Sequence, residues 1–217
     1  MDVVVGRDAA EHDSEQSRVT RRYDRMAWLY DIYDAPMEWM GTRRRRARLL
    51  AWASGRVLEV GVGTGRNLEH YPNTVTLSAI DVSPLMLARA RRRAGSLDRA
   101  VAFEVADVAA LPYRDDTFDT TVATCVFCSV ADPVEELREL GRVTKAEGRI
   151  LLLEHVRPRN RLLGWLADLA TTVTRRLFGF RANRRTEENV TTADLNIVEV
   201  RRAGVWREIV ARPAEPA

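Results

Sequence analysis

Cysteine is scarce in this chain of 217 residues, which contains two, Cys125 and Cys128, in the run CVFC. A structural zinc site built on four thiolates needs a second cysteine pair, and the sequence does not contain one. The apolar residues between the two cysteines favour the end of a buried strand or the wall of a pocket over a redox or metal site. We therefore expect no bound metal.

Long apolar runs are also missing. No uninterrupted apolar segment approaches the roughly 20 residues that a membrane-spanning helix requires. The N-terminal residues pass quickly from Val5 and Gly6 to charged side chains, unlike a secretory signal peptide. With 46% hydrophobic and 30% charged residues, the composition predicts one folded domain with a single sizeable core, kept in the cytoplasm.

Lysine is nearly absent. Lys145 is the single lysine, so arginine supplies the other basic side chains, and the net charge of the chain is +3. Guanidinium groups suit bidentate phosphate contacts, although a GC-rich genome would enrich arginine without a functional reason. Such a bias explains the total but not the clustering. Eight arginines lie between residues 157 and 185 against Asp168 alone, and a second basic block occupies residues 43–46 and 48.

Short apolar runs alternate with helical segments along the rest of the chain. Strands are predicted at 56–60, 75–80, 101–106, 118–127, 149–156, 197–202 and 206–210, and helices at 84–94 and 133–143, after a helical segment from 14 to about 52. Strands that alternate with helices form a mostly parallel sheet covered on both faces. The predicted fold is therefore a doubly wound α/β domain with a seven-stranded, mostly parallel sheet.

The glycine-rich stretch EVGVGTGRN, residues 59–67, follows the first predicted strand. Gly61, Gly63 and Gly65 lack a Cβ, so they accept positive φ angles and allow a ligand to approach the backbone. In open α/β sheets, ligands bind at the carboxyl ends of the strands. A G-x-G-x-G turn alone is a weak signal, because many tight turns contain it.

Acidic residues at the ends of the next two predicted strands strengthen that signal. Asp81 lies 22 residues after Glu59, where a carboxylate can accept hydrogen bonds from both hydroxyls of a ribose. Asp107 follows the third strand, beside an apolar backbone, where it can accept from the exocyclic amine of an adenine. Each acid alone is compatible with a helix cap. Three successive strand ends of this kind predict a nucleoside site.

In these segments the sequence resembles the class I S-adenosylmethionine-dependent methyltransferases. The resemblance covers roughly residues 20–210, and the segments that carry it agree in order and spacing: EVGVGTGRN, AIDVSPLML (79–87), ADVAALPYRDDTFD (106–119) and RVTKAEGRILLLEH (142–155). One departure is KAEG at 145–148, where relatives commonly have K-P-G-G. The resemblance implies a Rossmann-like methyltransferase fold with N-terminal lid helices and S-adenosylmethionine as the cofactor.

The resemblance also implies roles for individual residues. Each implied role is carried onto a residue that matches the motif. The resemblance implies that the methionine side of the pocket is shaped by Glu59, Gly61, Gly63 and Gly65, and that the ribose is held by Asp81. It also implies adenine contacts by Val82, Met86, Asp107 and Val108, and places Cys125 and Ser129 under the sulfonium and methionine. Residues 1–13 are acidic and polar and lack periodicity, which predicts a mobile tail before one domain at 14–217. Within that domain, lid helices occupy 14–53, the cofactor-binding core 54–156, a basic amphipathic insertion 157–190 and the terminal strands 191–217.

An aromatic stretch at residues 23–40 is the first indication of where the methyl acceptor binds. Tyr23 and Tyr30 are seven residues apart and share a helix face. In relatives such a helix covers the cofactor, which implies cofactor contact by Tyr23, a catalytic role for Tyr30 and substrate binding by Tyr33. The alternative for each ring is an aromatic lid packed on the sheet. His155 is a second catalytic candidate, as a proton acceptor or a phosphate ligand, with a purely structural histidine as the alternative.

The basic insertion carries apolar side chains every three or four residues, which predicts an amphipathic helix. Basic charge beside an apolar stripe suits an anionic lipid surface, and Arg181 and Arg184 are the predicted substrate-binding residues. The alternative is a helix that caps the domain with its arginines solvated. The sequence alone leaves both interpretations open.

Three segments sharpen the resemblance toward bacterial phospholipid N-methyltransferases, which methylate phosphatidylethanolamine: CVFCSVADP (125–133), LLLEHVRP (151–158) and FGFRANRRTEENV (178–190). Quinone C-methyltransferases and membrane-associated thiol methyltransferases are close relatives. We therefore expect a monomeric, peripherally membrane-associated enzyme acting on the head-group amine. A small thiol or quinone acceptor and a non-catalytic cofactor-binding scaffold are the alternatives. No nucleic-acid partner is expected.

Overall fold

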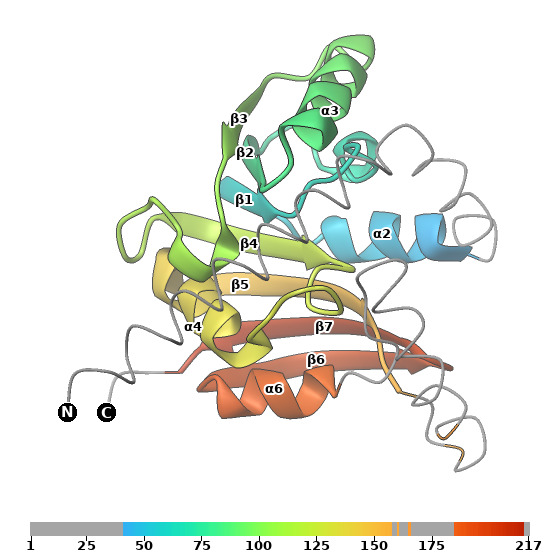
Figure 1. The fold of residues 1–217 in the computed structure, drawn as a ribbon, viewed down its shortest axis with the longest axis vertical. Coiled ribbons are helices and arrows are strands. Elements are labelled where there is room, and N and C mark those ends of the chain that lie inside the picture. The colour runs from blue at the N-terminus through green and yellow to red at the C-terminus, as the bar shows by residue number, and fades with distance from the viewer. Residues whose placement is uncertain (1–40, 158–159, 161–164, 166–184, 215–217) are drawn as a thin grey trace.

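The structure is a computed structural model that describes residues 41–157, 160, 165 and 185–214 (Figure 1). The predicted tail, most of the lid helices and most of the basic insertion lie outside these residues. The described elements are α2 (Arg43–Leu50), β1 (Arg56–Val60), η2 (Leu68–His70), β2 (Thr76–Asp81), α3 (Pro84–Ser96), β3 (Val101–Val105), η3 (Val108–Ala110), β4 (Phe118–Thr124), α4 (Pro133–Val143), β5 (Thr144–His155), α6 (Thr186–Thr192), β6 (Leu195–Ala203) and β7 (Trp206–Pro213).

The predicted seven-stranded, mostly parallel sheet is confirmed. Its strand order is β3-β2-β1-β4-β5-β7-β6, and the first five of these strands pair in parallel. β7 runs antiparallel to both β5 and β6, so the predicted terminal pair around Gly204 is also confirmed. The chain leaves β1 toward β2 and β3 on one side and later returns to β4 on the other. This reversal of strand order lies between β1 and β4, the neighbours at the centre of the sheet.

Two apolar clusters, one on each face, hold the helices to the sheet. Val57 packs with side chains from α2 and α3, whereas Leu58 and Val60 pack with side chains from α4 and α6. Successive strand residues point to opposite faces, so β1 contributes to both clusters. A strand that is buried on both faces reads as a continuous apolar run, which is why the bounds of β1 at 56–60 were predictable.

Several predicted strands have different bounds, and β4 and β5 show why. The strand predicted at 118–127 ends at Thr124, because Cys125 has a φ of +58°, which no strand residue adopts. The strand predicted at 149–156 begins earlier, at Thr144. The pairing of β4 with β5 shifts register between Phe118 and Thr120, so the KAEG segment at 145–148 forms an irregular extension of β5 instead of a separate turn.

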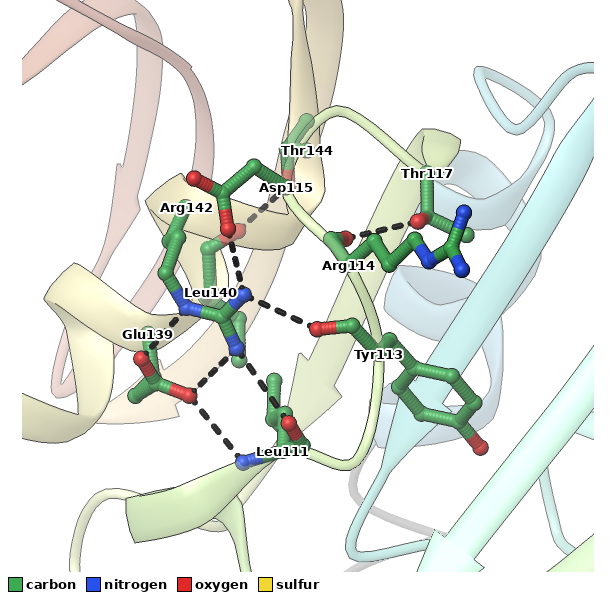
Figure 2. Close-up of polar contacts among 9 residues, drawn as sticks. All are labelled: Leu111, Tyr113, Arg114, Asp115, Thr117, Glu139, Leu140, Arg142 and Thr144. Carbon is green, nitrogen blue, oxygen red and sulfur yellow. Dashed lines mark hydrogen bonds and ion pairs between the residues drawn. The ribbon is translucent and has the colours of Figure 1, made fainter.

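The segment between η3 and β4 is fastened to α4 by Arg142 (Figure 2). Its guanidinium donates to the carbonyl oxygens of Leu111 and Tyr113 at 3.2 and 2.9 Å, and to the carboxylates of Asp115 and Glu139. Glu139 in turn accepts from the backbone N–H of Leu111 at 3.0 Å. The carboxylates beside Arg142 raise the pKa of its guanidinium above its usual value. This cluster fixes the chain directly after Val108, which contributes to the site described below.

Buried and exposed valines should differ sharply in their contribution to stability. We expect Val57→Ala to lower the free energy of unfolding by about 2–3 kcal/mol, because it removes two methyl groups from a fully buried position and leaves a cavity. The matched control is Val105→Ala on the edge strand β3, where the side chain is 54% exposed. That change should cost no more than about 0.5 kcal/mol. Urea unfolding of both variants measures the difference, and equal costs would contradict the two-faced core.

Candidate functional site

A pocket opens at the carboxyl ends of β1, β2 and β4, where the strand order reverses. Its empty space is about 690 Å³, including space open to solvent. Its lining brings together most of the predicted cofactor residues: Gly61, Gly63, Asp81, Val82, Met86, Val108, Cys125 and Ser129. Residues from four separate segments of the sequence therefore meet at one place, as the motif spacing predicted.

The glycine-rich turn needs its glycines for two different reasons. Gly61 and Gly63 have φ angles of +62° and +54°, and both line the pocket. A Cβ on Gly61 would lie 2.6 Å from Cγ2 of Val126, whereas a Cβ on Gly63 would meet no atom within 4 Å. Gly65 is different, because it packs against Leu68 and Ala90 and is not part of the pocket lining. Its predicted role is thus indirect, in allowing the turn to approach α3.

Asp81 joins the glycine-rich turn to the start of α3. Its Oδ2 accepts from the N–H of Gly63 and its Oδ1 from the N–H of Ser83, each at 2.9 Å. Ser83 is the N-cap of α3 and accepts from Met86 N–H at 3.1 Å. Both carboxylate oxygens are hydrogen-bond acceptors at the edge of the pocket, which suits the hydroxyls of a ribose.

Much of the pocket lining is apolar. Ile80, Val82, Met86, Ala106 and Val108 supply it, as a flat heteroaromatic ring requires. Asp107 is not part of this lining, and its Oδ1 accepts from the N–H of Ala109 at 3.0 Å, which caps η3. Its predicted contact with the adenine edge stays a prediction.

The loop after β4 forms the remaining wall. Cys125 leaves the strand in the left-handed conformation while its N–H donates to the carbonyl of Leu153 at 2.8 Å. The buried carboxylate of Glu154 accepts from the N–H groups of Val126 and Phe127 at 2.8 and 3.0 Å. Glu154 therefore shapes the loop that carries Cys125 and Ser129.

His155 lies beside the site and not in its lining. Its ring packs against Trp206, with centroids 6.2 Å apart, and burial lowers the pKa of its imidazole. Potential ligand atoms of Cys128, Glu154 and His155 lie within 4.8 Å of one another. These three donors are fewer than the four of a structural zinc site. The expected absence of a bound metal stays a prediction. Tyr23, Tyr30, Tyr33, Arg181 and Arg184 all lie outside the described residues.

Sequence reasoning missed a buried polar network behind the glycine-rich turn. Asn67 donates to Glu59 at 2.8 Å, and Tyr71 donates to the other oxygen of Glu59 at 2.9 Å. Arg46 of α2 donates to Asn67 at 2.7 Å and to Thr124 at 2.8 Å. Glu59 faces this network and is not part of the pocket lining. Asn67 ends the glycine-rich stretch, so its position was visible in the sequence, but its partner Arg46 was hidden in a run of arginines.

These residues fit S-adenosylmethionine, the cofactor that the resemblance implied. The apolar wall suits the adenine, Asp81 suits the ribose, and the open space at Gly63 leaves room for the ligand against the backbone. The wall at Gly61, Thr124 and Cys125 would then hold the methionine portion.

Burial raises the pKa of Glu59 to about 7, against the lowering effects of Tyr71, Asn67 and Arg46. The folded protein therefore binds more protons than the unfolded chain between pH 4.5 and 7, and this contribution to stability is lost as the pH rises through 7. We expect Glu59→Gln to remove this pH-dependent loss of stability. As the pH rises from 4.5 to 8, the free energy of unfolding of the variant should therefore increase by roughly 3 kcal/mol relative to that of the unaltered protein. Urea unfolding across this range measures it.

The matched control is Glu139→Gln, because contact with Arg142 lowers the pKa of Glu139. The contribution of the Glu139 carboxylate to stability is complete above the pKa that this group has in the unfolded chain, and it is lost only in more acidic solution. An equal stability difference at pH 5 and pH 8 for Glu59→Gln would contradict the assignment.

Asp81→Ala should weaken binding of S-adenosylhomocysteine at least tenfold, because it removes the ribose acceptor and frees the N–H of Gly63. The control, Asp119→Ala, lies at the other end of the sheet, where Asp119 accepts from Lys145 and from the N–H of Arg56. That variant should keep its ligand affinity even if it loses stability. Titration calorimetry separates the two effects, and retained affinity in Asp81→Ala would remove the residue from the site.

Comparison with known proteins agrees with this geometry. A family described as a methyltransferase domain matches residues 58–152. A phosphatidylethanolamine N-methyltransferase of Cereibacter sphaeroides is 36% identical over 65% of this chain and 70% of its own length. A demethylmenaquinone methyltransferase of Renibacterium salmoninarum is 33% identical over 69% of this chain and 63% of its own length. The crystal structure of a SAM-dependent methyltransferase from Methanosarcina mazei superposes with a TM-score of 0.61 at 21% identity, covering 74% of this chain and 93% of the other.

Proposed function

Because the chain belongs to the class I S-adenosylmethionine-dependent methyltransferases, we propose that it methylates the head-group amine of phosphatidylethanolamine at a membrane surface. The observation that carries the choice of acceptor is the 36% identity to a phosphatidylethanolamine N-methyltransferase, over 70% of that protein.

The cofactor supplies an activated methyl group, so the protein has to position and desolvate the acceptor. The pocket contributes an apolar wall and a sulfonium-side wall formed by the loop after β4. The amine must lose its proton before attack. His155 suits this step, since burial lowers its pKa and keeps the imidazole able to accept a proton. Tyr30 and Tyr33 remain the proposed residues around the amine.

A basic surface on α2 supports a phospholipid acceptor. Arg43 and Arg44 are exposed on this helix, which lies beside the carboxyl ends of β1 and β4 (Figure 1). Arg43 also lines a surface groove with Arg66, Arg93 and Glu69, whose net charge is positive. Guanidinium groups on this surface would attract phosphate head groups.

Membrane contact of this enzyme is proposed as peripheral. No helix in the described part of the chain is long and apolar enough to cross a membrane. The basic insertion, with Arg181 and Arg184, is the proposed second contact with lipid.

A quinone ring is the second candidate acceptor. Several demethylmenaquinone methyltransferases are 30–36% identical to this chain, close to the identity of the phospholipid enzyme. Carbon methylation of a quinol needs no lone pair on nitrogen, so the two acceptors differ in product and not in cofactor chemistry.

The deciding experiment incubates the purified protein with methyl-labelled cofactor and vesicles of phosphatidylethanolamine and phosphatidylglycerol. We expect label in monomethylated phosphatidylethanolamine, and none in demethylmenaquinol supplied in the same vesicles. Label in the quinol alone would replace the proposal with its alternative.

Arg44→Gln should weaken binding to these anionic vesicles about fivefold, because one basic group near the surface contributes about 1 kcal/mol. The control is Arg201→Gln, an exposed arginine on the edge strand β6. Vesicle flotation measures both variants. Equal binding of both would exclude α2 as a membrane contact.

A further inference from the structure

We infer that Arg45 of α2 binds the phosphate in the head group of the methyl acceptor, at a site outside the cofactor pocket. The inference rests on the proposed function, because it takes the head-group amine to be held at His155. It names a residue that recognises the part of the acceptor that is not methylated.

A row of neighbouring side chains leads from the cofactor pocket to Arg45. Ser129 lines the pocket, and its Oγ lies 3.5 Å from Sγ of Cys128. That sulfur and a ring nitrogen of His155 lie within 4.8 Å of each other. The ring of His155 packs against Trp206 with centroids 6.2 Å apart, and Cζ of Arg45 lies over the Trp206 ring, 5.9 Å from its centroid. The row therefore leads away from the cofactor and ends at a cation.

Three elements bring this row to the carboxyl edge of the sheet. β5 ends at His155 and β7 begins at Trp206, and these two residues are partners in the antiparallel pairing. α2 packs against β5, and Arg45 lies in its first turn. In a phosphoethanolamine head group, a two-carbon spacer separates the amine from the phosphate. An amine held at His155 can thus place its phosphate further along the row, toward Arg45.

The described side chains around Arg45 carry an excess of positive charge. Glu208 of β7 is buried, and both of its carboxylate oxygens accept from Arg48, one from Nε at 2.7 Å and the other from Nη2. Nε of Arg45 is 3.8 Å from this carboxylate, which is beyond hydrogen-bond range. Arg48 therefore satisfies Glu208 by itself, and the charge of Arg45 is available to an anion.

The guanidinium of Arg45 is held in a fixed orientation. Its Nη1 donates to the carbonyl oxygen of Gly41 at 3.1 Å, and Trp206 lies against its face. Within the described part of the chain, Nη2 makes no hydrogen bond, and the side chain is 20% exposed. A guanidinium presents its donors along its edge, which matches the oxygens of a phosphate. A quinol carries no anionic group and gains no comparable contact.

The test measures initial rates with phosphatidylethanolamine in micelles of a nonionic detergent, whose neutral surface removes the general attraction of basic groups to anionic lipid. Arg45→Gln removes the charge. We expect it to raise KM for the lipid about tenfold, the effect of one charge-assisted hydrogen bond. Its kcat and its affinity for S-adenosylhomocysteine should stay unchanged, because a contact with a phosphate that does not react is equally strong before and during methyl transfer.

Two further variants distinguish phosphate binding from a structural role. Arg45→Lys keeps the charge and should recover most of the loss in KM. Arg201→Gln makes the same chemical change at an exposed position of β6 and should have the KM of the unaltered protein. If Arg45→Gln does not fold, Arg45→Met keeps an apolar stem against Trp206 and gives the same comparison. An unchanged KM without the charge would overturn the inference, as would an equal loss of affinity for S-adenosylhomocysteine.

The outcomes separate this inference from the proposed function. Methylation of phosphatidylethanolamine with the same KM in Arg45→Gln and in the unaltered protein would support the acceptor and refute the role of Arg45. Failure of the unaltered protein to methylate this lipid would refute the acceptor and, with it, the inference.

Discussion

The burial of the Glu59 carboxylate at the end of the central strand constrains everything around it. A buried carboxyl needs partners, and Asn67, Tyr71 and Arg46 are gathered about it from the glycine-rich turn, from the segment after η2 and from α2. The same contacts determine where the turn leaves β1 and where α2 lies against the sheet. Thr124 belongs both to the pocket lining and to this network, whose other members, Glu59, Asn67, Tyr71 and Arg46, are not in the lining.

The residues of the glycine-rich motif have two separate roles, lining the pocket and supporting the turn. Gly61, Gly63 and Asp81 face the pocket, whereas Glu59 and Gly65 support the turn from behind. The acidic residue that begins the motif therefore acts on the ligand through its neighbours. Its burial also explains why the site depends on α2, a helix that precedes the cofactor-binding core in the sequence.

The fold was predictable from the sequence because its signals are local. Local apolar patterns predicted β1, α4 and the terminal antiparallel pair, and the spacing of the glycines and acidic residues predicted the pocket. The end of β4 was not predictable, since an apolar run continues through Phe127 while the backbone turns at Cys125. Nor was the Arg46–Thr124 contact, which joins residues 78 positions apart and depends on packing that no periodicity reveals. The roles of Tyr30, Tyr33, Arg181 and Arg184 on the acceptor side stay predictions, because these residues lie outside the described part of the chain.

The close approach of Gly61 to Val126 has an evolutionary consequence. Position 61 is restricted twice, by a left-handed backbone and by a neighbouring side chain. Replacing Val126 by a smaller residue relieves the second restriction but not the first. Homologous sequences should therefore keep glycine at position 61 even where position 126 has drifted to alanine, and the two positions should show little covariation despite their contact.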